Sequence, residues 1–161
     1  MEDPLDAFED DDDGSLEDTY LTFCADEEEY AVPVTHVTEV VRLQQVFAVP
    51  DAPAHVRGVI NLRGKIIPLL DARGRFGLPT VSYSDRTVVI VLEFDESLTG
   101  LIVDAVSDVV ELPPDQQAQL GEVVTRQAQR SLVRAFGKRK EAVSFILDVP
   151  ALLNVDDKQP A

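Results

Sequence analysis

The chain has 161 residues, 45% of them apolar, and a formal net charge of −16 at pH 7. This length suits one domain, or two small barrels that share a core. Residues 1–29 hold 14 Asp and Glu and no Lys or Arg, whereas residues 30–161 hold 16 acidic and 14 basic residues. The acidity therefore belongs to an N-terminal segment that repels phosphate groups, which argues against nucleic acid and against an anionic membrane surface as partners.

Three further absences point to a cytoplasmic protein. Cys24 is the only cysteine, so no internal disulfide is possible, and we expect it to be a strand residue that fills the core or half of it rather than a reactive thiol. The acidic N-terminus lacks the apolar run of a secretory signal. No stretch reaches the roughly 18 apolar residues of a membrane span, so we expect no direct membrane insertion.

The first predicted elements are a tail and a hairpin. Residues 1–18 contain few large apolar residues and many acids, which predicts a disordered tail whose deletion leaves the melting temperature nearly unchanged. Residues 19–25 are rich in β-branched and aromatic types and predict a strand, and residues 30–32 predict its return strand.

A short helix is predicted over residues 33–40. Pro is well placed in a first helical turn, and Val34, Val37 and Val41 recur at steps of three and four residues. Residues 41–47 are predicted to return to an extended conformation.

The most informative stretch is residues 56–71. Two apolar runs flank a basic turn that contains Gly64, which is typical of a β-hairpin. Pro68 has no N–H, so its strand is expected at an edge or at a bulge. Arg63 at the tip has three open interpretations: a solvated tip, an internal ion pair with Glu39 as a possible mate, or a contact to a partner.

The rest of the chain predicts more strands. Apolar runs at residues 86–94, 98–103 and 106–112 are separated by turns, and residues 134–149 suggest a last hairpin before a short terminal helix. Residues 115–134 fit a helix moderately well. Short strands at this spacing predict a barrel or sandwich.

No reactive centre is evident in the sequence. His36 and His55 are the only histidines and lack a Cys pair, so a zinc site is not expected. There is no nucleophile elbow and no phosphate-binding loop. Four aspartates could in principle form a carboxylate pair, but turn or strand-end Asp is far commoner: Asp71, Asp85, Asp104 and Asp108. We therefore predict a protein with no enzymatic activity, no cofactor and no metal.

Several runs resemble the CheW-type chemotaxis coupling proteins. They are Leu21-Thr-Phe, Glu29-Tyr-Ala-Val-Pro-Val, Val37-Thr-Glu-Val, Val56-Arg-Gly-Val-Ile-Asn-Leu-Arg-Gly-Lys-Ile-Ile-Pro-Leu-Leu-Asp71, Thr87-Val-Val-Ile-Val-Leu92 and Gly100-Leu-Ile-Val-Asp-Ala-Val-Ser-Asp-Val-Val110. The similarity covers about residues 19–154. Its most specific parts are the block Asn61–Gly64 and the block Val103–Asp108, in this order.

The resemblance implies an all-β fold of two five-stranded, SH3-like barrels on a common apolar core, with a few short helices. We expect residues 1–18 and 155–161 to be tails, and the barrels of the 19–154 domain to divide near residue 85. The resemblance implies a non-catalytic adaptor that couples the cytoplasmic tip of chemoreceptors to the regulatory domain of a CheA-type histidine kinase.

The resemblance also implies two binding surfaces. Receptor-binding candidates are Val37, Glu39, Gly58, Asn61, Arg63 and Ile66, and kinase-binding candidates are Val46, Asp85 and Val88. We expect Arg63→His or Gly58→Asp to disrupt receptor coupling while leaving the fold largely intact.

The chain departs from the family pattern after Gln117, where an Ile-Arg-Pro type segment is replaced by Ala118-Gln119-Leu120 and the sequence to Arg139 is unusually polar and basic. This motivates an alternative: a variant adaptor that lacks one interface and serves another kinase pathway, such as motility or development.

Overall fold

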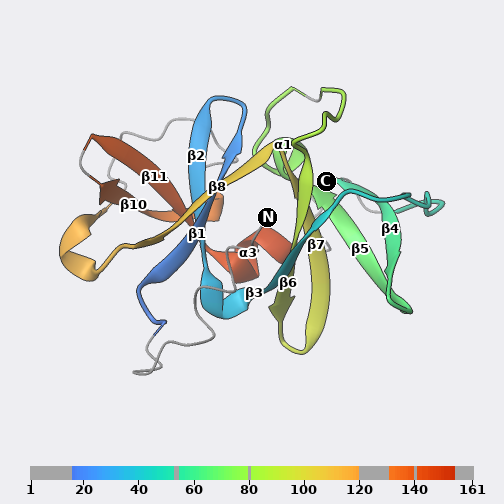
Figure 1. Cartoon of the computed structure of the whole chain (residues 1–161), viewed down its shortest axis with the longest axis horizontal. Coiled ribbons are helices and arrows are strands. Elements are labelled where there is room, and N and C mark those ends of the chain that lie inside the picture. The colour runs from blue at the N-terminus through green and yellow to red at the C-terminus, as the bar shows by residue number, and fades with distance from the viewer. Residues whose placement is uncertain (1–15, 53–54, 80, 120–130, 140, 155–161) are drawn as a thin grey trace.

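The computed structural model describes residues 16–52, 55–79, 81–119, 131–139 and 141–154, and most of them lie in two β-sheets (Figure 1). The first sheet has the order β8-β1-β2-β11-β10-β9 and the second β3-β6-β7-β5-β4. The strands of the first sheet are β1 (Thr19–Ala25), β2 (Glu28–Pro33), β8 (Ala105–Glu111), β9 (Gln117–Ala118), β10 (Val133–Arg139) and β11 (Ala142–Leu147). Those of the second are β3 (Val37–Arg42), β4 (Val56–Leu62), β5 (Lys65–Asp71), β6 (Val88–Phe94) and β7 (Ser97–Val103).

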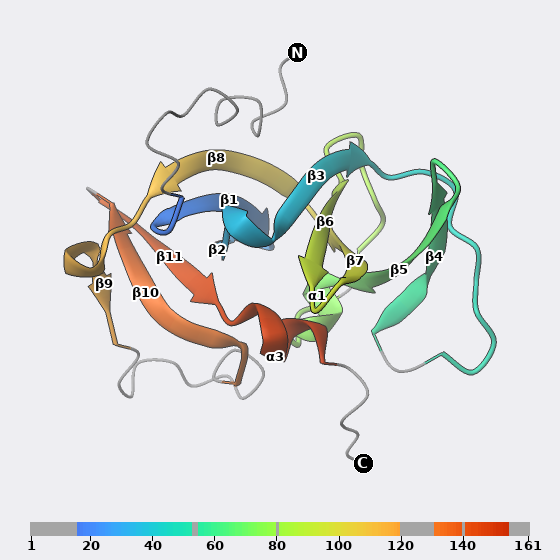
Figure 2. The same cartoon turned by 90° about the horizontal axis from the view of Figure 1, so that it is seen from below.

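The helices are short and lie between or beside the sheets (Figure 2). Those whose bounds lie within the described residues are α1 (Ala72–Arg75), α3 (Val149–Leu153) and the 3₁₀ turns Val34–His36 and Pro114–Gln116. We call the first sheet with its contents the first barrel and the second sheet with its contents the second barrel. The prediction of an all-β fold of two barrels with a few short helices is confirmed, and the two-residue strand β9 adds a sixth strand to the first sheet.

Three apolar clusters explain why so many strands are buried on both faces. The first-barrel core contains Tyr20, Ala31 and Ile146, and the second-barrel core contains Ile60, Ile67 and Val89. The largest cluster, here called the shared core, takes residues from both sheets. Because β1 and β6 each turn one side to their own barrel and the other to the shared core, they read as continuous apolar runs.

β8 carries a bulge in its pairing with β1, and the Thr22 side chain bonds to the backbone there. The register of β1 with β8 shifts between Thr22 and Phe23. The buried Thr22 hydroxyl accepts from the Asp108 N–H at 3.0 Å and donates to the Asp108 carbonyl at 3.1 Å. The hydroxyl therefore replaces ladder bonds that the bulge would otherwise leave unmade.

Two arginines of α1 fasten the two barrels together. Arg73 donates to Asp104 at 2.8 Å where β7 leads into β8, and it lies 3.7 Å from Asp26 in the β1–β2 turn. Arg75 donates to the carbonyls of Leu152 at 3.0 Å and Ala151 at 2.8 Å, in the last turn of α3. These contacts join the second barrel to the β1–β2 turn, to the start of β8 and to the last turn of α3.

Some predicted elements differ from the structure. The helix expected over residues 33–40 is only a 3₁₀ turn, followed directly by the edge strand β3. The division expected near residue 85 falls between β5 and β6, which belong to one sheet, so no single division of the sequence separates the barrels.

The strand with Pro68 is not an edge strand, since β5 lies between β7 and β4. Its pairing with β7 nevertheless begins only at Leu69, so Pro68 faces no β7 residue in the ladder.

The helix predicted over residues 115–134 is largely untested, because residues 120–130 lie outside the described part. Around them the chain forms a 3₁₀ turn, β9 and the start of β10. Of the predicted tails, residues 1–15 and 155–161 also lie outside the described residues. Leu16 is described, and it packs against the shared core.

Candidate protein-binding site

The β4–β5 hairpin is built around a two-residue turn. Arg63 and Gly64 both have positive φ, 52° and 89°, and Leu62 pairs with Lys65 across the turn. This is the turn geometry that matches the twist of paired strands and favours glycine. The Asn61 side-chain oxygen accepts from the Gly64 N–H at 2.9 Å. Asn61 therefore holds the turn in shape and fixes where the Arg63 side chain is presented.

Arg63 forms an ion pair with Glu39 on β3. The Arg63 side chain is 68% exposed and that of Glu39 only 24%, so the guanidinium stays open to solvent while one of its edges is held. Of the three interpretations left open for Arg63, the internal ion pair is confirmed. It ties the tip of the β4–β5 hairpin to the edge strand β3.

Gly58 is buried and supports the backbone. Its φ is +146°, and a Cβ placed there would lie 2.4 Å from the Phe47 carbonyl oxygen and 2.8 Å from Val46 Cγ1. Phe47 exchanges two backbone hydrogen bonds with Val59, at 2.8 and 2.9 Å. Gly58 thus allows the Val46–Phe47 segment to lie on β4. The expectation that Gly58→Asp leaves the fold intact is wrong, because the side chain has no space.

The other receptor-binding candidates lie near Arg63. Ile66 is 63% exposed on β5, and Val37 is half-buried at the start of β3, where it packs against the shared core. Together with Glu39 and Arg63 they border one end of the second barrel.

The kinase-binding candidates are not brought together into one cluster by any described contact. Val88 pairs with Arg42 at the end of the β3–β6 ladder that is farthest from Val37. Asp85 is exposed in the loop before β6, and Val46 packs partly against the second-barrel core. Val88 and Val37 therefore mark opposite ends of the same pair of strands.

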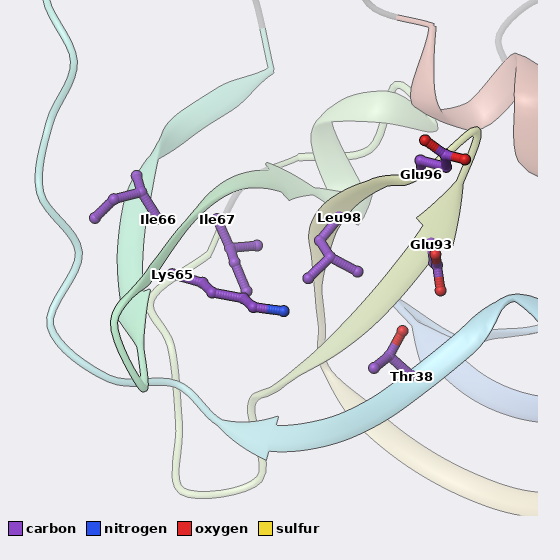
Figure 3. A pocket seen from close by; sticks show the side chains of 7 residues that line it. All are labelled: Thr38, Lys65, Ile66, Ile67, Glu93, Glu96 and Leu98. Carbon is purple, nitrogen blue, oxygen red and sulfur yellow. The ribbon is translucent and has the colours of Figure 1, made fainter.

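A hollow opens beside the hairpin tip, between β3, β5 and the β6–β7 turn (Figure 3). It has a volume of about 490 Å³ and is lined by Thr38, Lys65, Ile66, Ile67, Glu93, Glu96 and Leu98. Sequence reasoning identified only Ile66 of this set. One signal was available in the sequence: the β6–β7 turn, at Asp95 and Glu96, is acidic, whereas the β4–β5 turn, at Arg63 and Gly64, is basic. In the structure Asp95 and Glu96 both have positive φ.

Other kinds of site find no support among the described residues. No group of three His, Cys, Asp or Glu side chains gathers there that would hold a metal ion. No helix in the same ranges is long and apolar enough to cross a membrane. Cys24 is half-buried, and its sulfur lies 3.3 Å from the Ser107 hydroxyl on β8.

Comparison with known proteins gives a consistent result. Residues 19–157 match the CheW-like domain family. The chain is 35% identical over 138 residues to the chemotaxis protein CheW of Klebsiella aerogenes, covering 86% of this chain and 82% of that protein. It is 30% identical over 141 residues to the CheW of Bacillus subtilis, covering 88% of this chain and 90% of that one.

The fold agrees with a solved structure of the same kind. The scaffolding protein TtCheW from Thermoanaerobacter tengcongensis matches with a TM-score of 0.80 and 30% identity, over 89% of this chain and 97% of that one. Sequence, fold and the two-barrel arrangement lead to one conclusion: this chain belongs to the CheW-like family of chemotaxis adaptor and scaffold proteins.

Proposed function

We propose that this chain is a non-catalytic, cytoplasmic adaptor that couples chemoreceptors to a CheA-type histidine kinase in a signalling array. The single observation that carries the proposal is membership of the CheW-like family over residues 19–157, in a chain that has the two-barrel fold.

The proposed receptor surface is the hairpin-tip end of the second barrel. Ile66 supplies exposed apolar area there, and the half-buried Val37 lies at the start of the edge strand β3. Arg63 offers a guanidinium that Glu39 already orients. An oriented Arg loses less conformational freedom when it forms a hydrogen bond to a partner. Asn61 contributes by shaping the hairpin tip, and Gly58 by giving the Val46–Phe47 segment room on β4; this segment also carries the kinase-binding candidate Val46.

The proposed kinase surface contains Val46, Asp85 and Val88. Because Val88 and Val37 lie at opposite ends of the β3–β6 ladder, a kinase domain bound near Val88 leaves the hairpin tip free. An adaptor needs this separation, since it must hold two partners at once. Two small surfaces of about 1,000 Å² or less each give individually weak contacts, and an array gains strength by repeating them.

The proposal is tested by measuring the affinity of the full chain for two soluble fragments, a chemoreceptor cytoplasmic fragment and a kinase regulatory domain. We expect wild type to bind both, Arg63→His to weaken only receptor binding, and Asp85→Lys to weaken only kinase binding. Both substituted side chains are exposed, so folding is preserved.

Two results would contradict the proposal. Binding of neither fragment would remove the coupling function altogether. Loss of both partners in either variant would show that the surfaces are not separate. Binding of one fragment only would favour the variant adaptor that serves another pathway.

A further inference from the structure

The hollow beside the hairpin tip carries opposite charges on its two sides. Lys65 reaches in from β5 with its nitrogen toward the middle, while Glu93 on β6 and Glu96 in the following turn lie on the opposite side (Figure 3). Among the described residues, neither carboxylate has an ion-pair partner within 4 Å, and neither does the Lys65 ammonium. Their charges are available to a bound molecule, unlike that of Arg63, which already has Glu39.

Apolar side chains separate the two charged sides. Ile67 is buried at the floor, Leu98 is half-buried, and Ile66 is largely exposed at the rim. A site for a small molecule usually encloses most of its ligand. Here Thr38, Lys65, Glu93 and Glu96 are all exposed, so the hollow is open and fits the side chains of another protein better than a free metabolite.

The hollow results from the way β5 and β7 pair. Their parallel ladder runs from Leu69 opposite Gly100 to Asp71 opposite Ile102, and it does not extend toward the β5 start. The residue before Leu69 is Pro68, which has no N–H to continue the ladder. The hollow opens where this pairing stops, so β5 shapes one side of it and the β6–β7 turn with Glu96 shapes the other.

From these features we infer that the hollow binds one segment of the receptor in one direction only. An apolar side chain of that segment packs on Ile66 and Leu98, an acidic side chain faces Lys65, and a Lys or Arg faces Glu93 and Glu96. The inference rests on the proposed receptor function, because Ile66 belongs to both surfaces.

Direction follows from the placement of the charges. A segment that lies the other way sets its carboxylate against Glu93 and Glu96 and its cation against Lys65. Juxtaposed like charges are unfavourable at an interface, so the reversed complex is disfavoured even though the same apolar contact forms. The hollow thereby selects orientation, while the Arg63 surface contributes to affinity.

The test measures the affinity of the full chain for a soluble chemoreceptor cytoplasmic fragment by isothermal titration calorimetry. Three variants are compared with wild type: Lys65→Glu, Glu96→Lys, and the exchange of both. We expect each single reversal to weaken binding about fivefold, and the effect to shrink at high salt because rim charges are screened. The exchange keeps the net charge of the chain, so it separates charge placement from total charge. Because the unchanged Arg63 surface still holds the receptor in its original direction, we expect the exchange to weaken binding at least as much as a single reversal.

Matched controls are Lys138→Glu and Glu141→Lys, which make the same charge changes at exposed positions of the β10–β11 hairpin in the first barrel. We expect receptor affinity within twofold of wild type for both, in line with the small effect of distant exposed charges.

Several results would overturn the inference. If wild type binds the fragment and the exchange variant binds equally well, the hollow does not select orientation, while the receptor function stands. The same holds if the controls weaken binding as much as the test variants, or if the test variants weaken binding of the kinase regulatory domain or self-association instead. If wild type does not bind the fragment at all, the receptor function and this inference both fail.

Discussion

Arg63 is the side chain whose replacement should separate binding from stability. We expect Arg63→His to weaken receptor affinity about tenfold, since the loss of an oriented guanidinium at an interface commonly removes more than 1 kcal/mol of binding free energy. The melting temperature should change by about 2 °C or less, because an exposed ion pair contributes about 0–1 kcal/mol. Calorimetric titration and a thermal melt of the same samples check both values. A large drop in melting temperature with unchanged affinity would contradict this assignment.

Gly58 should behave in the opposite way. We expect Gly58→Asp to lower the free energy of unfolding by about 3 kcal/mol or more, because its Cβ would clash with the Phe47 carbonyl and its φ of +146° is strained for any L side chain. Gly58→Ala should be milder but still destabilising. Urea denaturation measures both.

The matched control is Gly64→Ala. Gly64 also has positive φ, but a Cβ there meets nothing within 4 Å, so a loss of only about 1 kcal/mol is expected. If Gly58→Ala and Gly64→Ala lower the free energy of unfolding equally, backbone conformation alone, and not contact with Phe47, determines the loss.

For individual residues, the pairing of side chains could be predicted from the sequence better than the contacts of the backbone. Glu39 could be named as a possible mate of Arg63 because a guanidinium pairs well with a carboxylate. The burial of Gly58 could not be inferred, since nothing local to β4 indicates that Phe47 crosses over it. The charges of the hollow were missed for a similar reason: Lys65 and Glu96 are far apart in sequence and meet only in the folded sheet.

The contact between α1 and the turn after β7 should be a strong link between the barrels. Arg73 is only 13% exposed, and its hydrogen bonds to Asp104 raise the pKa of the guanidinium. In a double-mutant cycle of Arg73→Ala with Asp104→Ala, we expect a coupling free energy of about 1–2 kcal/mol. Arg86→Ala, at an exposed position, is the control and should have little effect on unfolding. Additive losses in the cycle would mean that the two side chains act independently.

Among the elements, the β4–β5 hairpin was predictable and the stretch after Pro33 was not. The hairpin has a local signal, since a glycine in a tight turn lies between two apolar runs. The valines of β3 mimic a helix because the strand is contacted from two sides: Val37 and Val40 pack on the shared core, while Val41 packs on the second-barrel core. A strand between two cores loses the alternation of apolar and polar residues on which prediction depends.

For the molecule as a whole, the N-terminal boundary of the fold can be located by two deletions. Removing residues 1–15 should change the melting temperature by about 1–2 °C at most, because their sequence holds few large apolar residues. Removing residues 1–18 also takes away Leu16, which packs on the shared core, and the Asp18 carbonyl, which accepts from the Leu112 N–H at 2.8 Å.

We therefore expect a loss of about 1–3 kcal/mol for the longer deletion, and a melting temperature lower by several degrees. This revises the expectation that residues 1–18 are dispensable. Identical melting curves for the two deletions would place the boundary after Asp18 instead.

The overall architecture could be predicted only through family resemblance. Strand spacing indicates a barrel or sandwich, but β1 pairs with β8 across more than 80 residues, as Thr22 does with Asp108. No local pattern contains that information. For this reason the division expected near residue 85 does not coincide with the sheets.

The interleaved order of the sheets has a consequence for synthesis. All five strands of the second sheet lie within residues 37–103, so that sheet can assemble while the rest of the chain is still on the ribosome. β1 and β2 of the first sheet are synthesised earlier, but they can complete their sheet only after β8, β10 and β11 have been made. The last of these, β11, ends at Leu147. During translation the edges of β1 and β2 stay open longest, and these are the edges that a chaperone would have to shield from other nascent chains.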